Sequence, residues 1–172
     1  MKQKKKIKMY KTEKANLNDV DTIVSLIEEG RKHIQEYHID QWGNGYPNID
    51  TIKEDVDNKR GYVLLDEDDI VGYYVVLEHD PCYDYIEGKW IDNSKYVAIH
   101  RVVTKGFNKG LGSILFSELK KKYKHIRVDT HEGNISMNKC LLKNDFNYCG
   151  VIYLKDGAKR NAYEYIINSE EK

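Results

Sequence analysis

The chain has 172 residues, a length that suits one domain with a hydrophobic core rather than two domains. It carries 28 basic and 28 acidic residues, so its formal net charge is zero and no overall field would recruit nucleic acid or an acidic membrane surface. The longest apolar run, IVGYYVVL at 70–77, has the length of a strand and falls far short of the roughly 20 residues that cross a bilayer. We therefore expect one domain that binds neither nucleic acid nor membrane.

The cysteines and the start of the chain indicate a cytoplasmic protein. Cys82, Cys140 and Cys149 are odd in number and lack CxxC spacing, which is typical of free thiols in a reducing compartment and predicts no metal site. The basic start, MKQKKKIK, lacks the apolar segment of a signal peptide. The expected organisation is a flexible basic start, one folded domain and a flexible end, at residues 1–7, 8–167 and 168–172.

The first part of the sequence predicts two helices joined by a loop. Asn18 is a candidate N-cap for a first helix, whose apolar residues follow helical spacing. Those residues are Val20, Ile23, Val24, Ile27 and Ile34. A loop rich in Gly, Asn and Pro follows at 38–48, and a mostly polar second helix is expected to begin near Asn48 or Asp50 and to end by Gly61.

The rest of the sequence predicts strands and two more helices. Strands at 62–65 and 70–77 flank the acidic turn DEDD and form a hairpin, and 81–94 is expected to be a loop. A β-branched strand at 96–103 leads into the glycine-rich stretch TKGFNKGLGS and an amphipathic helix. The last predicted elements are a strand at 126–130, a helix at 136–144, and strands at 148–154 and 161–167. This order predicts an α/β domain with a mixed sheet and a βαβ unit at 96–130.

The stretch TKGFNKGLGS, residues 104–113, has the composition of an anion-binding loop. In a strand–loop–helix unit, the loop N–H groups and about four unpartnered N–H groups of the helix end converge on one spot. Lys105 and Lys109 would add positive charge at the rim. The spacing matches neither GxxxxGK[ST] nor GxGxxG, which leaves K-G-x-G-[ST] at the head of a helix.

The run VVTKGFNKGLGSILF resembles the acyl-CoA signature of the GNAT superfamily of N-acetyltransferases. The order of elements agrees with that superfamily over nearly all of 8–167, and THEGNISMNKCLLKNDFNYCG is similar to its segment in which an Asn, here Asn134, opens a short helix. Asp145 and Phe146 stand where Gly-Phe is usual, and QWGNGYPN, IHRVV and RVDTHEGN resemble a group of uncharacterised bacterial members. The resemblance implies the single-domain GNAT fold with a mixed α/β sheet and acetyl-CoA as the acyl donor.

The same resemblance implies how acetyl-CoA is held. The loop backbone would bind the pyrophosphate, and the strand edge would pair with the amide-rich pantetheine arm. The cofactor-binding residues so implied are Val102, Val103, Thr104, Gly106, Phe107, Asn108, Lys109, Gly110, Leu111, Gly112, Ser113 and Asn134. Phe107 stands where the family usually has Arg or Gln, and Leu141 stands where many members have a Tyr general acid, so that role is vacant or filled from elsewhere.

Candidates for the chemistry lie where the strands 96–103 and 126–130 would part. The imidazole of His100 suits a general base at neutral pH, although His100 could instead be a core or solvent-facing histidine. Asp129 and His131 share a face if the strand continues, and they could equally brace the following turn. These three residues lack further ligand spacing, so no metal is expected.

The loop QWGNGYPN is the candidate acceptor site. By the resemblance, it overhangs the end of the sheet where acyl transfer occurs, and Gln41, Trp42 and Tyr46 would wall the acceptor pocket, unless both aromatic residues simply cap the core. The leading hypothesis is direct acetyl transfer to a small-molecule primary amine in a ternary complex. The alternatives are an acetyltransferase for a protein or peptide and a catalytically weak CoA-binding module. Dimers are frequent in the resembled family, so a homodimer is a further expectation.

Overall fold

The computed structural model describes residues 8–106 and 109–168. Within these ranges the helices are α1 (Val20–Gln35), α2 (Ile49–Asp57), α3 (Leu111–Lys122) and α4 (Ile135–Lys143), with 3₁₀ turns η1 (Leu17–Asp19) and η2 (Pro81–Tyr83). The strands are β1 (Tyr10–Lys14), β2 (Gly61–Asp66), β3 (Asp69–Leu77), β4 (Glu87–Gly88), β5 (Val97–Thr104), β6 (His125–Thr130), β7 (Asn147–Tyr153) and β8 (Lys159–Ile166). The predicted flexible ends lie outside the described residues, apart from Asn168.

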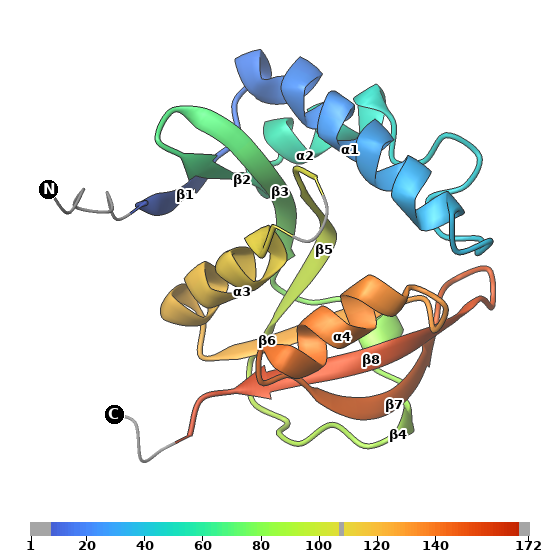
Figure 1. Ribbon diagram of the computed structural model, residues 1–172. Helices are drawn as coiled ribbons and strands as arrows, with labels where there is room; N and C mark the ends of the chain where they lie inside the picture. The colour runs from blue at the N-terminus through green and yellow to red at the C-terminus, as the bar shows by residue number, and fades with distance from the viewer. Residues whose placement is uncertain (1–7, 107–108, 169–172) are drawn as a thin grey trace, which may run out of the picture.

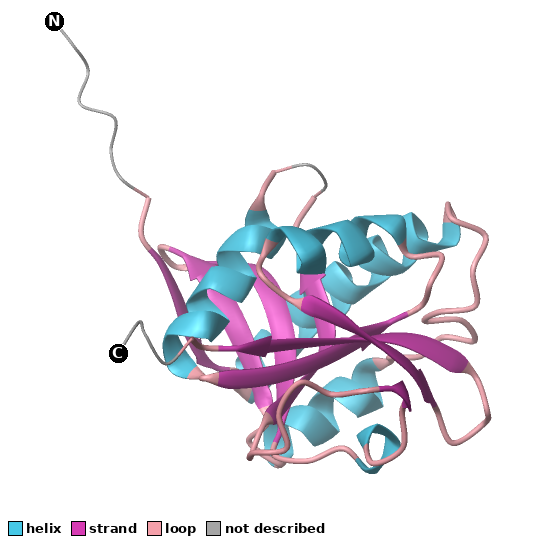
Figure 2. Ribbon diagram, turned by 90° about the horizontal axis from the view of Figure 1, so that it is seen from below, coloured by secondary structure: helices cyan, strands magenta, loops and turns pink. Residues whose placement is uncertain are grey.

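The strands form one mixed sheet in the order β1-β2-β3-β5-β6-β8-β7-β4. Strands β5 and β6 are parallel and are connected through α3, so the predicted βαβ unit is present; the other neighbouring pairs are antiparallel. Figure 1 shows β5 and β6 at the junction of the two halves of the sheet, and Figure 2 shows that the strands of the two halves run in clearly different directions. The predicted mixed α/β fold is confirmed.

Helices cover both faces of the sheet (Figure 1). Helices α1 and α2 pack on one face, where Ile23 and Ile27 of α1 meet Tyr73 and Val75 of β3 in one core cluster. Helices α3 and α4 pack on the other face, and their buried residues Leu115, Phe116, Leu119 and Leu141 belong to a second cluster. Because both faces of β2 and β3 are covered, these strands are continuous apolar runs and not alternating ones.

A buried polar cluster fixes the segment that precedes β5. The carboxylate of Glu164 on β8 lies 2.8 Å from both His125 Nε2 and Arg127 Nε, and it also accepts the Ile91 N–H at 2.6 Å. The Arg127 guanidinium lies 4.2 Å from the ring centroids of Trp90 and Tyr96. Such satisfied networks order the chain around them, so residues 90–96 are anchored against the sheet.

Local predictions failed at three places. Asn18 does not cap α1; instead Asn16 and Asp19 form a capping box around η1, just before α1 begins. Strand β1 was not predicted, because its sequence YKTEK lacks an apolar alternation, as is common for a polar edge strand. The predicted loop 81–94 contains η2 and the short strand β4.

Candidate active site

The parallel strands β5 and β6 part after three paired residues. The last pair is Ile99 with Val128, while β5 stays paired with β3 as far as Thr104 and β6 stays paired with β8 as far as Thr130. The part of β5 beyond Ile99 therefore has an edge that no described strand pairs with. In open α/β sheets, ligands bind at the carboxyl ends of parallel strands, where connections diverge.

A β-bulge lies at this point of β5. Tyr73 pairs with Val103 and Val75 pairs with His100, so Arg101 and Val102 together oppose one residue of β3. Arg101 has φ +51°, an unusual value for a residue with a side chain. Bulges redirect side chains next to functional sites.

Three adjoining cavities form one groove along β5. The inner cavity, of about 360 Å³, lies where the strands part; the connecting cavity, of about 110 Å³, borders Val102–Thr104; and the loop cavity, of about 630 Å³, borders the glycine-rich loop. Asn134 and Met137 line the inner and connecting cavities, and Thr104 and Gly106 line the connecting and loop cavities. The groove therefore joins the predicted catalytic residues to the predicted phosphate site.

The described part of the glycine-rich loop has the geometry of an anion site. Gly106 and Gly110 have φ of +69° and +72°, and Gly110 is the N-cap of α3 without a side-chain cap. The first N–H groups of α3, which form the positive end of the helix dipole, thus lie at the loop cavity. The Gly106 N–H donates at 2.8 Å to the carboxylate of Glu29 on α1. Phe107 and Asn108, predicted to contribute to this loop, lie outside the described residues.

Two lysines of α4 contribute to the same cavity, although they were not predicted from the sequence. Lys139 and Lys143 line the loop cavity opposite Gly110, Gly112 and Ser113. Their spacing of four residues places them on one face of α4, a signal that becomes informative only once α4 is known to border the loop. They give this end of the groove a positive wall.

His100 and Asp129 are brought together at the inner cavity, and both line it. His100 Nε2 lies 2.8 Å from Oδ2 of Asp80, and His100 Nδ1 lies 3.8 Å from Oδ2 of Asp129. The Asp80 carboxylate is within ion-pair distance of Nε2, but the alignment departs from that of a hydrogen bond, and Nε2 has no hydrogen-bond partner among the described residues. The Tyr83 hydroxyl donates to Asp129 Oδ2 at 2.6 Å.

The electrostatics of this group favour an ionised Asp80 and a neutral Tyr83. Burial acts to raise the pKa of Asp80, but the contacts to His100 and to the Cys82 N–H outweigh it and lower that pKa. Burial, followed by the charge of Asp129, raises the pKa of Tyr83 well above its ordinary value. The Tyr83 hydroxyl therefore remains a donor to Asp129 across the neutral pH range.

Asp80 and Tyr83 were missed because their contacts cross the sheet. Both belong to the turn after β3, in the segment predicted to be a plain loop. The sequence Asp-Pro does carry a local signal for this turn, since Asp80 Oδ1 accepts the Cys82 N–H at 2.9 Å. Nothing in that signal indicates a histidine twenty residues later.

His131 and Asn134 have local roles at the end of β6. His131 Nδ1 accepts the Gly133 N–H at 2.9 Å, and His131 does not line any of the three cavities; burial lowers its pKa. Asn134 caps α4 by accepting the Met137 N–H at 3.3 Å. His131 thus braces the following turn, which is the second of the two roles considered for it.

The loop 38–48 closes one side of the inner cavity. Gln41, Trp42 and Tyr46 all line it, and Gln41 Oε1 accepts from Asn134 Nδ2 at 3.2 Å. Arg31 of α1 holds the loop backbone by donating to the carbonyls of Trp42 and Pro47. Trp42 also packs against the α1 core cluster, so its ring both covers the core and borders the cavity.

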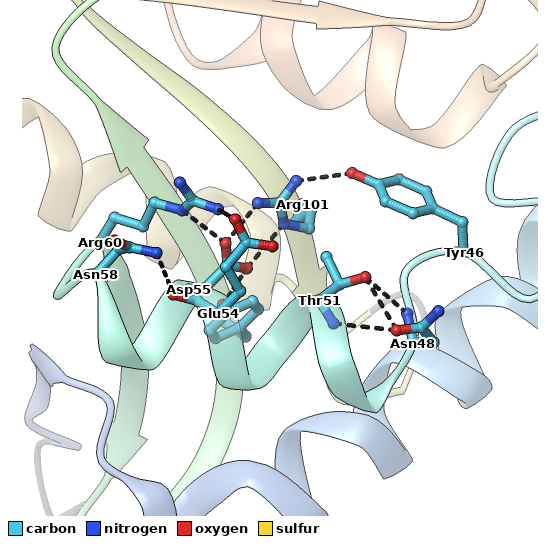
Figure 3. A network of polar contacts seen from close by, with 9 residues as sticks. Tyr46, Asn48, Thr51, Glu54, Asp55, Asn58, Arg60 and Arg101 are labelled. Atoms are coloured by element: carbon cyan, nitrogen blue, oxygen red, sulfur yellow. Dashed lines mark hydrogen bonds and ion pairs between the residues drawn. The ribbon is translucent and has the colours of Figure 1, made fainter.

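A buried carboxylate supports this wall from behind (Figure 3). Asp55 of α2 is 0% exposed and accepts from Arg101 Nε and Nη2 at 2.8 and 2.5 Å, from Arg60 Nε at 2.8 Å and from the Tyr73 hydroxyl at 2.8 Å. Arg101 Nη1 donates to the Tyr46 hydroxyl at 2.8 Å. The β-bulge therefore links the cavity-lining loop to the core.

Three further residues in or near α4 and β6 bear on the site. Leu141, at the position where the resembled family often has Tyr, is 0% exposed in the core, and α4 contains no tyrosine. Asp145 has φ +70°, so it adopts the backbone conformation that Gly provides at that position in the resembled family. Thr130 of β6 lines the inner cavity, and its Oγ1 is buried without a hydrogen-bond partner among the described residues.

No group of three or more His, Cys, Asp or Glu side chains in the described ranges is placed to hold a metal ion. None of the helices in those ranges is both long and apolar enough to span a membrane.

Several solved structures are similar to this chain. An acetyltransferase of the GNAT family from Streptococcus agalactiae is 35% identical, with a TM-score of 0.86 over 93% of this chain and 96% of that one. A GNAT-family acetyltransferase from Listeria monocytogenes is 18% identical, with a TM-score of 0.62 over 92% and 95% of the two chains. Aminoglycoside acetyltransferase AAC(6')-Ib, in complex with coenzyme A and kanamycin, is 17% identical, with a TM-score of 0.66 over 92% and 95%. No protein-family model and no curated protein sequence matches the chain.

Proposed function

Because the chain belongs to the GNAT family of acetyltransferases, we propose that it transfers an acetyl group from acetyl-CoA to a primary amine of a small molecule. The observation that carries the proposal is the continuous groove, which has an anion site at one end and a histidine flanked by carboxylates at the other. Structures of AAC(6')-Ib with acetyl-CoA or with kanamycin support both the donor and the class of acceptor.

The loop cavity suits the phosphates of acetyl-CoA. The uncapped first turn of α3 supplies backbone donors, and Lys139 and Lys143 supply positive charge. A Cβ at Gly112 would lie 3.1 Å from Cys140 Sγ, so this glycine also keeps α3 and α4 close together. From there the edge of β5 at Val102–Thr104 offers its unpaired backbone groups to the amides of the pantetheine arm.

Acetyl-CoA supplies a thioester-activated acetyl group, and the residues at the inner cavity bind and deprotonate the amine. Asp129 attracts the ammonium form of the acceptor, and His100 Nδ1 takes one proton from it. The free amine then forms the N–C bond as the C–S bond breaks, and the thiolate departs with the electron pair. The amide nitrogen loses its excess proton to the departing thiolate or to water, which leaves the neutral amide. The imidazolium that results lies between Asp80 and Asp129 and later returns its proton to water.

Departure of the sulfur needs little assistance. With Leu141 in the core, α4 presents no phenol to the groove. An unperturbed thiol has a pKa of about 8.5, so a thiolate is a good leaving group near neutral pH without a general acid.

The inner cavity favours a small acceptor. Its volume of about 360 Å³ lies within the range of small-molecule sites, about 300–1,000 Å³. The loop residues Gln41, Trp42 and Tyr46 form a wall where an extended peptide would need an open path. The inner cavity therefore suits a small amine better than a protein substrate.

A test combines an amine panel with a matched pair of histidine variants. CoA release would be measured with acetyl-CoA and primary amines, using wild-type protein, His100→Ala and the control His79→Ala. His79 is a half-exposed histidine that also contacts an aspartate, at 2.7 Å, and does not line the inner cavity. We expect His100→Ala to lower kcat/KM about 10²-fold, while acetyl-CoA affinity measured by calorimetry stays unchanged.

Three results would contradict the proposal in different ways. Tight binding of acetyl-CoA without transfer to any amine would indicate a CoA-binding module. Transfer that is equally fast in wild type and His100→Ala would move the role of base to another group. Activity on peptides but not on small amines would refute the acceptor class alone.

A further inference from the structure

We infer that Asp80 is a positioning residue for His100: its carboxylate fixes the ring so that the proton stays on Nε2 and Nδ1 faces the cavity as the basic nitrogen. The inference rests on the proposed function, because it specifies how the proposed base is oriented. Asp80 does not line the inner cavity, so it acts on the acceptor only through His100.

The two nitrogens of His100 have unequal surroundings. Nε2 is buried and lies 2.8 Å from the Asp80 carboxylate, while Nδ1 lies 3.8 Å from the Asp129 carboxylate. A carboxylate beside a ring nitrogen favours the tautomer in which that nitrogen carries the hydrogen. Asp129 Oδ2 already accepts a hydrogen bond from the Tyr83 hydroxyl. The interaction of Asp80 with the imidazole is therefore the stronger of the two carboxylate contacts.

Asp80 is itself held on several sides. Its Oδ1 accepts the Cys82 N–H at 2.9 Å, which leaves Oδ2 directed at His100. Its backbone N–H donates to the Tyr96 hydroxyl at 3.2 Å, and Pro81 fixes the backbone at the start of η2. An orienting carboxylate must be fixed in this way, since a mobile one would not select a tautomer.

A single turn therefore serves both polar groups of the inner cavity. Asp80 at its start contacts His100, and Tyr83 at its end contacts Asp129, with the Tyr83 ring centroid 5.9 Å from that of His100. The ionisable groups that contact His100 are thus Asp80 and Tyr83 from the turn and Asp129 from β6. Arg101, its neighbour in β5, points to Asp55 and does not neutralise this group.

The chain offers a matched control for testing this role. Asp84 Oδ1 lies 2.7 Å from His79 Nε2, so it forms an aspartate–histidine contact of similar length only four residues from Asp80. That pair is largely exposed and does not line the inner cavity. Asp84→Asn therefore removes a similar contact without touching His100.

The experiment compares Asp80→Asn and Asp84→Asn by two measurements. For Asp80→Asn we expect kcat/KM to fall about tenfold or more at neutral pH, with an unchanged KM for acetyl-CoA. The pH profile of kcat/KM should differ from that of wild type, because Asp80 is the carboxylate nearest to His100. Nitrogen-15 NMR of His100 should show a loss of the Nε2–H tautomer preference, and Asp84→Asn should match wild type in both measurements.

The two readouts separate the failure of this inference from that of the proposed function. If His100→Ala leaves transfer unaffected, the proposed base is wrong, and the NMR tautomer alone decides whether Asp80 orients the ring. If Asp80→Asn keeps the wild-type tautomer and the wild-type pH profile, Asp80 has no positioning role. A loss of activity that only follows the folded fraction, with an unchanged pH profile, would also overturn the inference.

Discussion

Replacing Asp55 with asparagine should destabilise the protein by about 3–5 kcal/mol, the usual cost of removing one partner from a buried ion pair. Asp55 is 0% exposed and accepts four hydrogen bonds, three of them from Arg60 and Arg101. Asparagine keeps the shape but turns an amide group toward a guanidinium. Losing two charge-assisted hydrogen bonds at about 1.5–3 kcal/mol each gives a similar total.

The effect should depend on pH in a defined direction. Burial acts to raise the pKa of Asp55, but hydrogen bonds and charge from Arg101, then from Arg60 and Tyr73, lower it overall. A carboxyl group with a lowered folded pKa stabilises the protein above its unfolded pKa, about 3.9, and loses that contribution as pH falls through the folded value. The difference between wild type and Asp55→Asn should therefore be largest near neutral pH and shrink below about pH 4.

Urea denaturation at neutral and acidic pH would measure both effects. In a thermal melt near neutral pH, the same loss corresponds to a fall in Tm of roughly 6–20 °C for a domain of this size. The control is Asp57→Asn, an exposed position on the same helix, which should change stability by less than about 0.5 kcal/mol. Asp55→Asn could instead lower the free energy of unfolding by less than about 1 kcal/mol, or differ from wild type by the same amount at every pH. Either result would refute a stabilising role for the buried ion pair.

Three further predictions concern the groove. Gly110→Val should weaken acetyl-CoA binding about tenfold, because a residue with a side chain adopts φ +72° at a cost of about 1–2 kcal/mol. Lys109→Ala should weaken it much less. If calorimetry gave the reverse order, the phosphates would not be bound mainly through the main chain. Glu29→Gln should tighten acetyl-CoA binding, because the Glu29 carboxylate accepts the Gly106 N–H and would repel a phosphate. Weaker binding in this variant would count against a phosphate at this loop. Trp42→Leu keeps the apolar packing against the α1 core cluster but removes the π face of the ring. It should raise the amine KM several-fold while the acetyl-CoA KM stays constant, since a cation–π contact contributes about 0.5–2 kcal/mol. An unchanged amine KM would show that Trp42 acts only as a core residue.

Predictions from the sequence succeeded where the structure depends on local chain chemistry. The β-branched run before Gly106 and the apolar stripe after Gly110 correctly predicted the strand and helix of the βαβ unit. The expectation that His100 and Asp129 lie together follows from parallel strands, whose carboxyl ends meet at one edge. Residues that follow the repeat of a strand or a helix could thus be placed without coordinates.

What the sequence could not predict depends on contacts between distant segments. Asp80, the N-cap of η2, contacts His100 of β5 although the two residues are twenty positions apart. The hydrophobic periodicity of the sequence does not indicate such a contact. Arg101 points to Asp55 because a bulge interrupts the alternation of β5, and a bulge at a non-glycine residue leaves no local mark. Strand β1 is ordered by its pairing with β2 rather than by its own residues.

The bulge in β5 also determines which changes of chain length this strand can accept. Ile99 and Val102 belong to the core on the α3 side, whereas Val103 belongs to the core on the α1 side. In an uninterrupted strand, Ile99 and Val103 would lie on the same face. The bulge reverses that relation, so a strand of the same length without the bulge would move one of these side chains out of its core, and with it either the histidine or the strand edge of the groove. Deleting one residue at Arg101 would restore regular pairing and leave both side chains in their cores, so homologous sequences should be one residue shorter here only where they also lack the contact between Arg101 and Asp55.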